Sequence, residues 1–151
     1  MNLLDWEQRL RCALKHGTLS QCGDVNDSYC PILDGEENIN RNGIILSSFC
    51  LEDACLTHDV YRTTIKRFST LLKPGGFILL IHGRNQTFYS VIGKHFFALP
   101  INEESTREAL EQSGFVDIHV IGVTKPRSPI ADADGFIIAH AYKPEFADSF
   151  T

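Results

Sequence analysis

The chain has 151 residues, of which 43% are hydrophobic and 22% are charged, and its formal net charge is −5. This length suits one domain, and a chain of this size buries roughly 70% of its unfolded surface when it folds. The acidic balance, without a basic stripe interleaved with aromatic residues, excludes nucleic acid as an expected partner. No apolar run approaches the roughly 18 residues that a membrane-spanning helix needs, so we expect no membrane partner.

The cysteines indicate a reducing, cytoplasmic location. Five cysteines stand at positions 12, 22, 30, 50 and 55, an odd number without a C-x-x-C pair. Secreted disulfide frameworks and structural zinc sites both use cysteines in closer or paired spacing, so we expect neither disulfides nor a metal site. The N-terminus lacks the pattern of a secretory signal.

The first third of the chain is predicted to alternate short elements with a long polar loop. Residues 6–16 have the apolar spacing of a helix, and residues Thr18–Val25 have the pattern of a short strand. Residues 26–43 are polar and indicate a loop with one weak helical turn. Residues Gly43–Phe49 then form an apolar strand that ends in small polar side chains.

The next helix and strand are the clearest elements of the sequence. Thr57 is a good N-cap for a helix whose apolar stripe runs to Leu72. Pro74 disfavours helical geometry at the residue before it, so the helix must end there, and a tight glycine turn follows. Residues Phe77–Ile81 are apolar without alternation, which is typical of a strand covered on both faces in an α/β sheet.

The remainder predicts a loop, a helix and two strands. Residues His82–Lys94 have the composition of a loop, and Asn102 caps a helix that Gly114 ends. Strands are predicted over Val116–Val123 and Phe136–Tyr142, joined by the polar loop 124–134, with a loose tail over 144–151. Because no helix joins the last two strands, we expect an antiparallel edge to an otherwise parallel α/β sheet.

Several motifs in this order resemble the family of nicotinamide, phenylethanolamine and thioether (indolethylamine) N-methyltransferases, which use S-adenosylmethionine (SAM). The segment L-S-S-F-C-L-E-D-A-C at 46–55 is the most specific, followed by L-L-K-P-G-G at 71–76. The other motifs are C-G-D-V at 22–25, T-F-Y at 87–89 with I-G at 92–93, T-R-E-A-L at 106–110 before S-G-F at 113–115, D-G-F at 134–136 and A-Y-K at 141–143. The resemblance spans about residues 10–143 and covers the C-terminal half of the family pattern.

The resemblance implies a partial Rossmann-like methyltransferase sheet in one partial domain over residues 1–151. The family's strand order is 3-2-1-4-5-7-6, and this chain would supply strands three to seven, with the last strand antiparallel and the first two strands lacking. No G-x-G occurs in the chain, so the glycine-rich turn that holds the methionine end of SAM is absent. The strand at 44–49 would then become an edge with an apolar flank.

The resemblance also implies the site residues. Asp24 and Val25 would lie at the adenine of SAM, and Ser48 and Phe49 beside its sulfonium, at the carboxyl end of a strand. Binding of SAM by this chain is expected to be weak. From the residues alone, Asp24 could equally be a turn residue without a ligand. Ser48 could equally be a strand residue whose hydroxyl bonds to the nearby backbone.

The acceptor residues follow in the same way. Gln86 and Tyr89 would face the acceptor, and Asp132 would approach its polar group. His82 and Asp132 are the candidate acid–base groups, since an ammonium acceptor must lose a proton whereas a pyridine nitrogen or a thioether needs no base. Without the resemblance, Tyr89 would be expected in the core and Asp132 in a solvated loop. His82 could be a functional residue at a strand end or an exposed surface residue.

Two classes of function remain open. The first is a SAM-dependent methyltransferase of small-molecule acceptors, N-methylating a pyridine or an amine, in truncated form. The second is a catalytically inactive relative that binds a partner or is an unstable fragment. The family resemblance implies a monomer when the domain is complete and self-association when it is truncated.

Overall fold

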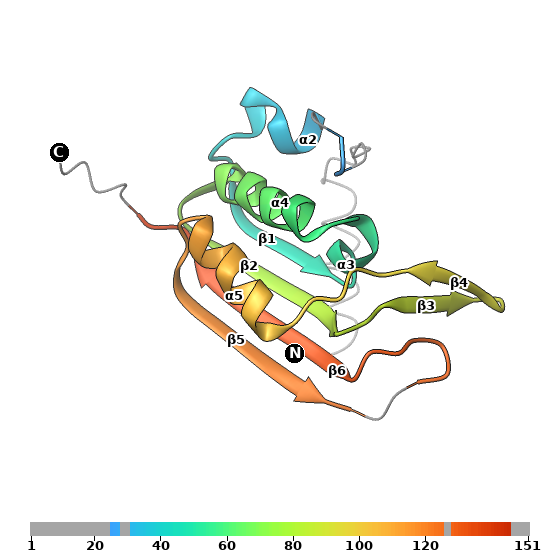
Figure 1. Ribbon diagram of the computed structural model, residues 1–151. Coiled ribbons are helices and arrows are strands. Elements are labelled where there is room, and N and C mark those ends of the chain that lie inside the picture. Colours follow the sequence, from blue (N-terminus) through green and yellow to red (C-terminus); the bar gives the residue numbers. More distant parts are fainter. Residues whose placement is uncertain (1–24, 28–30, 126–127, 146–151) are drawn as a thin grey trace, which may run out of the picture.

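The protein is described by a computed structural model over residues 25–27, 31–125 and 128–145. Its centre is a four-stranded mixed sheet in the order β1-β2-β6-β5 (Figure 1). β1 (Asn42–Ser48) pairs in parallel with β2 (Leu72–Arg84), and β6 (Gly135–Tyr142) pairs antiparallel with both β2 and β5 (Val116–Thr124). This is the order 4-5-7-6 that the resemblance implied, so the partial sheet is confirmed. The predicted helix at 6–16 and the predicted strand at 18–25, apart from Val25, lie outside the described residues.

Two helices cover one face of the sheet (Figure 1). α4 (His58–Leu71) begins at Thr57, whose hydroxyl accepts the Val60 N–H at 3.2 Å, so the predicted cap is confirmed. α5 (Glu103–Gln112) begins at Asn102 in a capping box with Ser105 and is followed by Gly114 at φ +79°, as its sequence predicted. Short helices α2 (Pro31–Asp34), η1 (Glu36–Asn38) and α3 (Leu51–Ala54) flank β1. No helix of the described part of the chain is long and apolar enough to cross a membrane.

The core lies between these helices and the sheet face that they cover. Alternate residues of β2 and β6 point into it, and all are almost fully buried: Ile78, Leu80, His82, Ile137, Ala139 and Ala141. Tyr61 and Ile65 of α4 and Leu110 of α5 meet this row. The apolar residues that recur every 3.6 positions in the helices and every second position in the strands therefore form one apolar layer.

We call the opposite face of the sheet the open face, because no helix of the described residues covers it. The strand register places these residues on it: Ile44, Leu46, Ser48, Phe77, Leu79, Ile81, Val116, His119, Ile121, Val123, Phe136, Ile138, His140 and Tyr142. Ile44, Leu46 and Ile121 are 69%, 63% and 58% exposed. β1 has no second neighbour among the described strands, so it forms the apolar edge that the resemblance implied.

Two details of the sequence prediction were wrong. The segment 73–76 is a bulge within β2 rather than a separate turn, since β1 pairs with β2 at Asn42↔Leu72 and next at Ile44↔Phe77. β2 continues to Arg84 because β6 pairs with it there, so His82 lies in a strand. The last two strands form the expected antiparallel edge, because β6 pairs antiparallel with β5 and β5 is the outer strand.

The predicted loop at 82–94 also contains a hairpin. β3 (Phe88–Val91) and β4 (Lys94–Phe97) are joined by Ile92 and Gly93, both with positive φ. This is the backbone of a type I′ turn, and the sequence analysis missed it because Ile is a rare first residue of such a turn. The hairpin projects from the body of the molecule (Figure 1).

Candidate functional site

Residues implied by the resemblance gather where β1 and β2 end and β6 begins. Ser48 is the last residue of β1, and the Phe49 N–H donates to the Ile81 carbonyl at 2.8 Å. Phe49 has φ +47°, and its half-exposed ring meets the Phe136 ring edge-on at 5.6 Å between centroids. In open α/β sheets this edge, at the carboxyl ends of parallel strands, is where ligands bind.

A buried hydrogen-bond chain anchors the segment that follows Phe49. Glu52 and His82 are 1% and 0% exposed, and His82 Nδ1 lies 3.2 Å from Glu52 Oε2. The other oxygen of Glu52 accepts the Gly83 N–H at 2.9 Å. Because a carboxylate only accepts, His82 Nδ1 donates to Glu52, and His82 Nε2 lies 3.2 Å from the Tyr61 hydroxyl. Burial raises the pKa of that hydroxyl.

His82 therefore lies on the helix face of the sheet, in the core, with both ring nitrogens engaged. The Phe49 ring lies on the other side, against Phe136 of the open face. The structure does not bring these two predicted site residues together.

Asp132 is engaged with the start of the hairpin. One carboxylate oxygen accepts the N–H groups of Thr87 and Phe88 at 2.8 and 3.2 Å, and the other accepts the Thr87 hydroxyl at 2.5 Å. Partial burial alone would raise the pKa of Asp132, but these hydrogen bonds outweigh it and the pKa is lowered. Tyr89 forms a bridge with Ala131, so Asp132 and Tyr89 lie in adjoining segments.

Gln86 lies beside them, with only 8% of its surface exposed. Its side chain packs over Gly83 so closely that a Cβ there would lie 2.2 Å from Gln86 Oε1. Within the described part of the chain, the side-chain amide of Gln86 has no hydrogen-bond partner.

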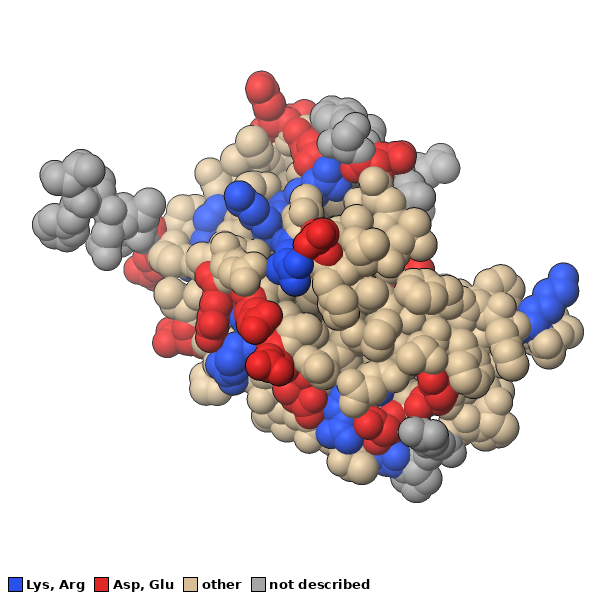
Figure 2. Space-filling view, viewed as in Figure 1, with Lys and Arg blue, Asp and Glu red and all other residues tan. Residues whose placement is uncertain are grey.

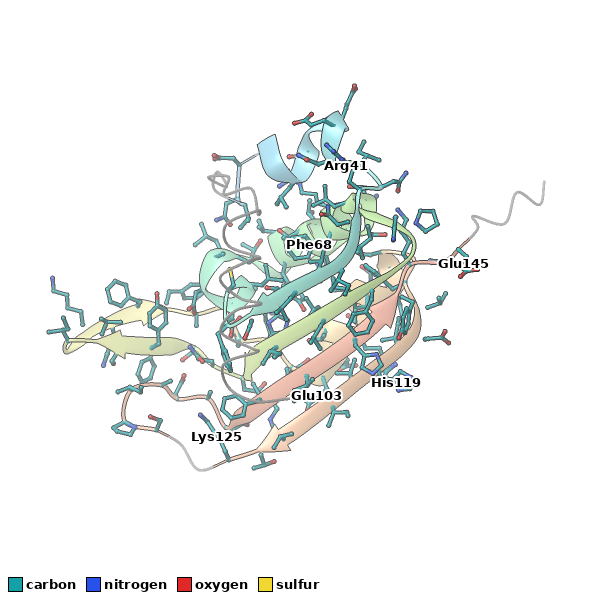
Figure 3. The ribbon with its side chains drawn as sticks, turned by 180° about the vertical axis from the view of Figure 1, so that it is seen from behind. Arg41, Phe68, Glu103, His119, Lys125 and Glu145 are labelled. Carbon is teal, nitrogen blue, oxygen red and sulfur yellow. The ribbon has the colours of Figure 1, made fainter. Side chains whose placement is uncertain are left out.

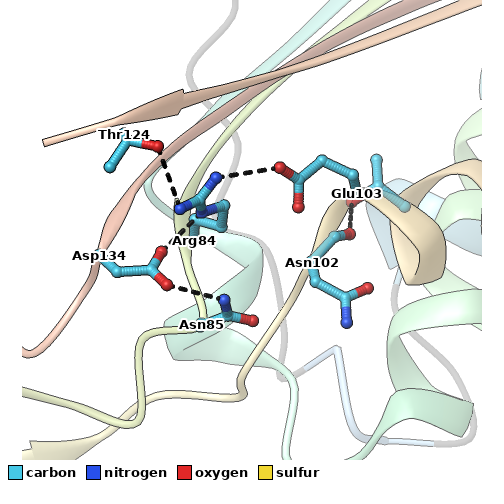
Figure 4. A network of polar contacts seen from close by, with 7 residues as sticks. Arg84, Asn85, Asn102, Glu103, Thr124 and Asp134 are labelled. Carbon is cyan, nitrogen blue, oxygen red and sulfur yellow. Dashed lines mark hydrogen bonds and ion pairs between the residues drawn. The ribbon is translucent and has the colours of Figure 1, made fainter.

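A network of charged and polar side chains lies at the same edge of the sheet, around Arg84 (Figure 4). Arg84 donates to Asp134 at 2.6 Å, to Glu103 at 3.2 Å and to the Thr124 hydroxyl at 3.3 Å. Asn85 donates to the second oxygen of Asp134 at 3.0 Å. These bonds tie the end of β2 to the start of α5 and to β6, and hold the edge in place.

Asp53 is a group that the sequence analysis missed. Partial burial and the nearby Glu52 carboxylate raise the pKa of this exposed side chain to about 6. Glu52 itself carried no sequence signal, because its neighbours His82 and Gly83 lie about 30 residues away. Their meeting depends on the parallel pairing of β1 and β2.

Of the predicted adenine contacts, Asp24 lies outside the described residues. Val25 packs against the core, and its carbonyl accepts from Arg67 at 3.3 Å. The neighbouring Asn26 side chain donates to the Ala54 carbonyl at 2.8 Å and accepts the Leu56 N–H at 3.0 Å. The segment at 25–27 is therefore fixed next to α3.

Comparison with known sequences decides the family. The sequence model of the NNMT/PNMT/TEMT family matches residues 2–144. The chain belongs to this family. Nicotinamide N-methyltransferase of Sus scrofa is 31% identical over 113 residues, which cover 75% of this chain and 40% of the relative. Phenylethanolamine N-methyltransferase of Homo sapiens is 34% identical over 71 residues, covering 47% of this chain and 25% of the relative.

This family member spans about 40% of the length of the curated nicotinamide relatives that it matches. Solved structures agree on its fold. A 1,6-didemethyltoxoflavin-N1-methyltransferase of Burkholderia thailandensis, bound to its substrate and S-adenosylhomocysteine, matches with a TM-score of 0.57 at 17% identity, covering 91% of this chain and 56% of that one. A SAM-dependent methyltransferase of Archaeoglobus fulgidus matches with a TM-score of 0.59 at 12% identity, covering 91% and 72%.

Proposed function

We propose that this chain is the acceptor-side part of a SAM-dependent methyltransferase of small molecules. The observation that supports this most is the family match over residues 2–144, in a chain whose Ser48, Phe49, Gln86 and Asp132 all border one edge of the sheet. Relatives named as nicotinamide and phenylethanolamine N-methyltransferases methylate nitrogen, so we infer N-methylation as the reaction.

The described residues fit SAM along one side. Phe49 offers a half-exposed ring beside Ser48, at the end of a parallel strand, which suits the adenosyl and sulfonium region. The chain has no G-x-G turn to hold the methionine end. We infer that this chain alone binds SAM weakly, and that tight binding needs contacts with the methionine end of SAM that these residues do not provide.

The acceptor that fits best is neutral. SAM, when bound, supplies an electrophilic methyl group, and alignment in a dry site provides most of the acceleration. Asp132 already accepts three hydrogen bonds, and His82 is buried with both nitrogens engaged. Neither is free to deprotonate an ammonium, whereas the neutral amide of Gln86 can orient a pyridine or a carboxamide without proton transfer. We therefore favour a pyridine-type acceptor over an amine.

A titration with S-adenosylhomocysteine, followed by NMR of backbone amides, tests the proposal. We expect millimolar binding with shifts at Ser48, Phe49 and Gln86, and loss of those shifts in Phe49→Ala. Ile92→Ala, an equally apolar but remote truncation, is the matched control and should bind as the wild type does. A folded chain without any shift up to several millimolar would favour the second candidate, a non-catalytic relative that binds a partner. The unpaired edge of β1 among the described strands is the observation that keeps this candidate open.

A further inference from the structure

The base of the β3–β4 hairpin bonds to a carboxylate from another part of the chain. Residues 86–98 contain no Asp or Glu, and Lys94 is their only Lys or Arg, so the hairpin is mostly tan in Figure 2, with blue at its tip. The segment 128–132, which precedes β6, runs beside the hairpin in the opposite views of Figures 1 and 3. Asp132 of this segment supplies the carboxylate.

Backbone contacts join the segment to the outer edge of β3. The Ser90 N–H donates to the Ile130 carbonyl at 2.7 Å, and Tyr89 forms an antiparallel bridge with Ala131. The segment thus adds a short third strand to the hairpin. Such a strand needs further support, since even a complete two-stranded hairpin is only marginally stable in water.

Asp132 ends this short strand and adds three hydrogen bonds. Its Oδ1 accepts the N–H groups of Thr87 and Phe88 at 2.8 and 3.2 Å, and its Oδ2 accepts the Thr87 hydroxyl at 2.5 Å. Partial burial works against ionisation, but these hydrogen bonds prevail and lower the pKa of Asp132. The group is therefore an acceptor-only carboxylate at neutral pH, and hydrogen bonds to an ionised acceptor are about twice as strong as neutral ones. We call these three bonds the Asp132 anchor.

We propose that Asp132 is a positioning residue, whose anchor holds its segment on the hairpin and thereby sets where Gln86 and Tyr89 lie at the acceptor edge. Thr87 and Phe88 stand between these two residues in the chain, so fixing their N–H groups fixes both neighbours. Asp132 thus acts on the acceptor through the hairpin, in place of the direct contact that the resemblance implied. The effect on the acceptor rests on the proposed function, whereas the anchor itself does not.

The chain offers graded variants of the anchor. Asp132→Ala removes all three bonds. Asp132→Asn keeps an oxygen for the two N–H groups, and its NH₂ can donate to the Thr87 hydroxyl. Thr87→Val removes only the bond of that hydroxyl, with little change in shape. Asp59→Ala is the control, because it removes an exposed carboxylate that pairs with Arg62 within α4.

Hydrogen exchange of backbone amides in the full chain, followed by NMR, measures the anchor. The Ser90 N–H reports on the added strand, and the Ala98 N–H, which donates to the Thr87 carbonyl at 2.9 Å, reports on the hairpin itself. We expect Ser90 to exchange at least tenfold faster in Asp132→Ala, less than threefold faster in Asp132→Asn and at an intermediate rate in Thr87→Val. Ala98 should change less than threefold in each of them, and Asp59→Ala should match the wild type.

Two exchange results would overturn the proposal. One is unchanged exchange of Ser90 in Asp132→Ala; the other is equal acceleration in Asp132→Asn and Asp132→Ala, which would assign the effect to the charge. If Asp132→Ala unfolds and Ala98 also exchanges fast, Thr87→Val decides, and unchanged exchange of Ser90 in that variant refutes the anchor.

Nicotinamide, added with S-adenosylhomocysteine, is the probe of the acceptor edge. We expect its shifts at Gln86 and Tyr89 to persist in Asp132→Asn and its binding to weaken at least fivefold in Asp132→Ala. Loss of binding in Asp132→Asn with normal exchange would assign a direct contact and overturn the positioning role. A wild type that does not bind nicotinamide contradicts the proposed function, while the expected exchange pattern would still support the anchor.

Discussion

Removing the Glu52 carboxylate is the most informative perturbation of the core. Glu52 is buried and accepts the Gly83 N–H at 2.9 Å, while its other oxygen lies 3.2 Å from His82 Nδ1. In Glu52→Ala both donors stay buried without an acceptor, at about 1–3 kcal/mol each, so we expect a loss of about 4 kcal/mol. Domains of this size have roughly 5–15 kcal/mol of stability, so this variant should be marginally folded.

Two conservative variants separate the hydrogen bonds from the charge. Glu52→Gln keeps an oxygen for the Gly83 N–H, and its NH₂ can donate to His82 once the ring changes tautomer, so the expected loss is only about 1 kcal/mol. Tyr61→Phe removes the partner of His82 Nε2 and should cost about 1–2 kcal/mol. Because both groups act through His82, the double variant should deviate from additivity by at least about 0.5 kcal/mol.

Urea unfolding followed by circular dichroism measures these free energies. Glu108→Ala, at an exposed position of α5, is the control and should change stability by less than about 0.5 kcal/mol. Glu52→Ala within 0.5 kcal/mol or so of the wild type would refute the hydrogen-bond argument. If Glu52→Gln lost as much stability as Glu52→Ala, the hydrogen-bond argument would also be refuted, because the stability would then come from the charge of the carboxylate.

Three further variants test local features. The raised pKa of Asp53, about 6, means that the folded state holds its proton more tightly than the unfolded state, so stability should fall as the pH rises through 4 to 6. Asp53→Asn should remove that fall and raise Tm at pH 7.5 by a few degrees at most, because the side chain is exposed. Lys143→Met should cost about 1–3 kcal/mol in urea, since Lys143 Nζ donates to Asn40 Oδ1 and to the Ser69 and Leu72 carbonyls at 2.8–2.9 Å. Ile92→Asn should add about 0.5–1 kcal/mol of stability, because Asn adopts positive φ more readily than Ile.

Local signals predicted the two longest described helices and most strand positions. Thr57 and Asn102 determine where α4 and α5 begin, because a cap acts through the next three residues of the chain. Gly114 ends α5 for an equally local reason. The strand order followed from the resemblance, not from the pattern of apolar residues.

The candidate site was harder to predict, because its contacts join distant segments. His82 follows an apolar run and looked like the start of a loop, yet pairing with Ile137 of β6 keeps it in the strand and in the core. Asp132 looked like a solvated loop residue, yet it holds Thr87, 45 residues earlier in the chain. Only the fold brings such pairs together, so residue type alone could not distinguish a buried anchor from a free catalytic group.

The apolar strands were nevertheless informative about both faces of the sheet. The unbroken run Phe77–Ile81 predicted a strand covered on each side, and the structure covers the side of Ile78 and Leu80 with α4 and α5. On the other side Leu46 and Ile121 remain more than half exposed. Selection for folding alone would favour alternating polar residues on a face that meets water. The sequence thus encodes a sheet with two apolar faces, of which the described helices cover one.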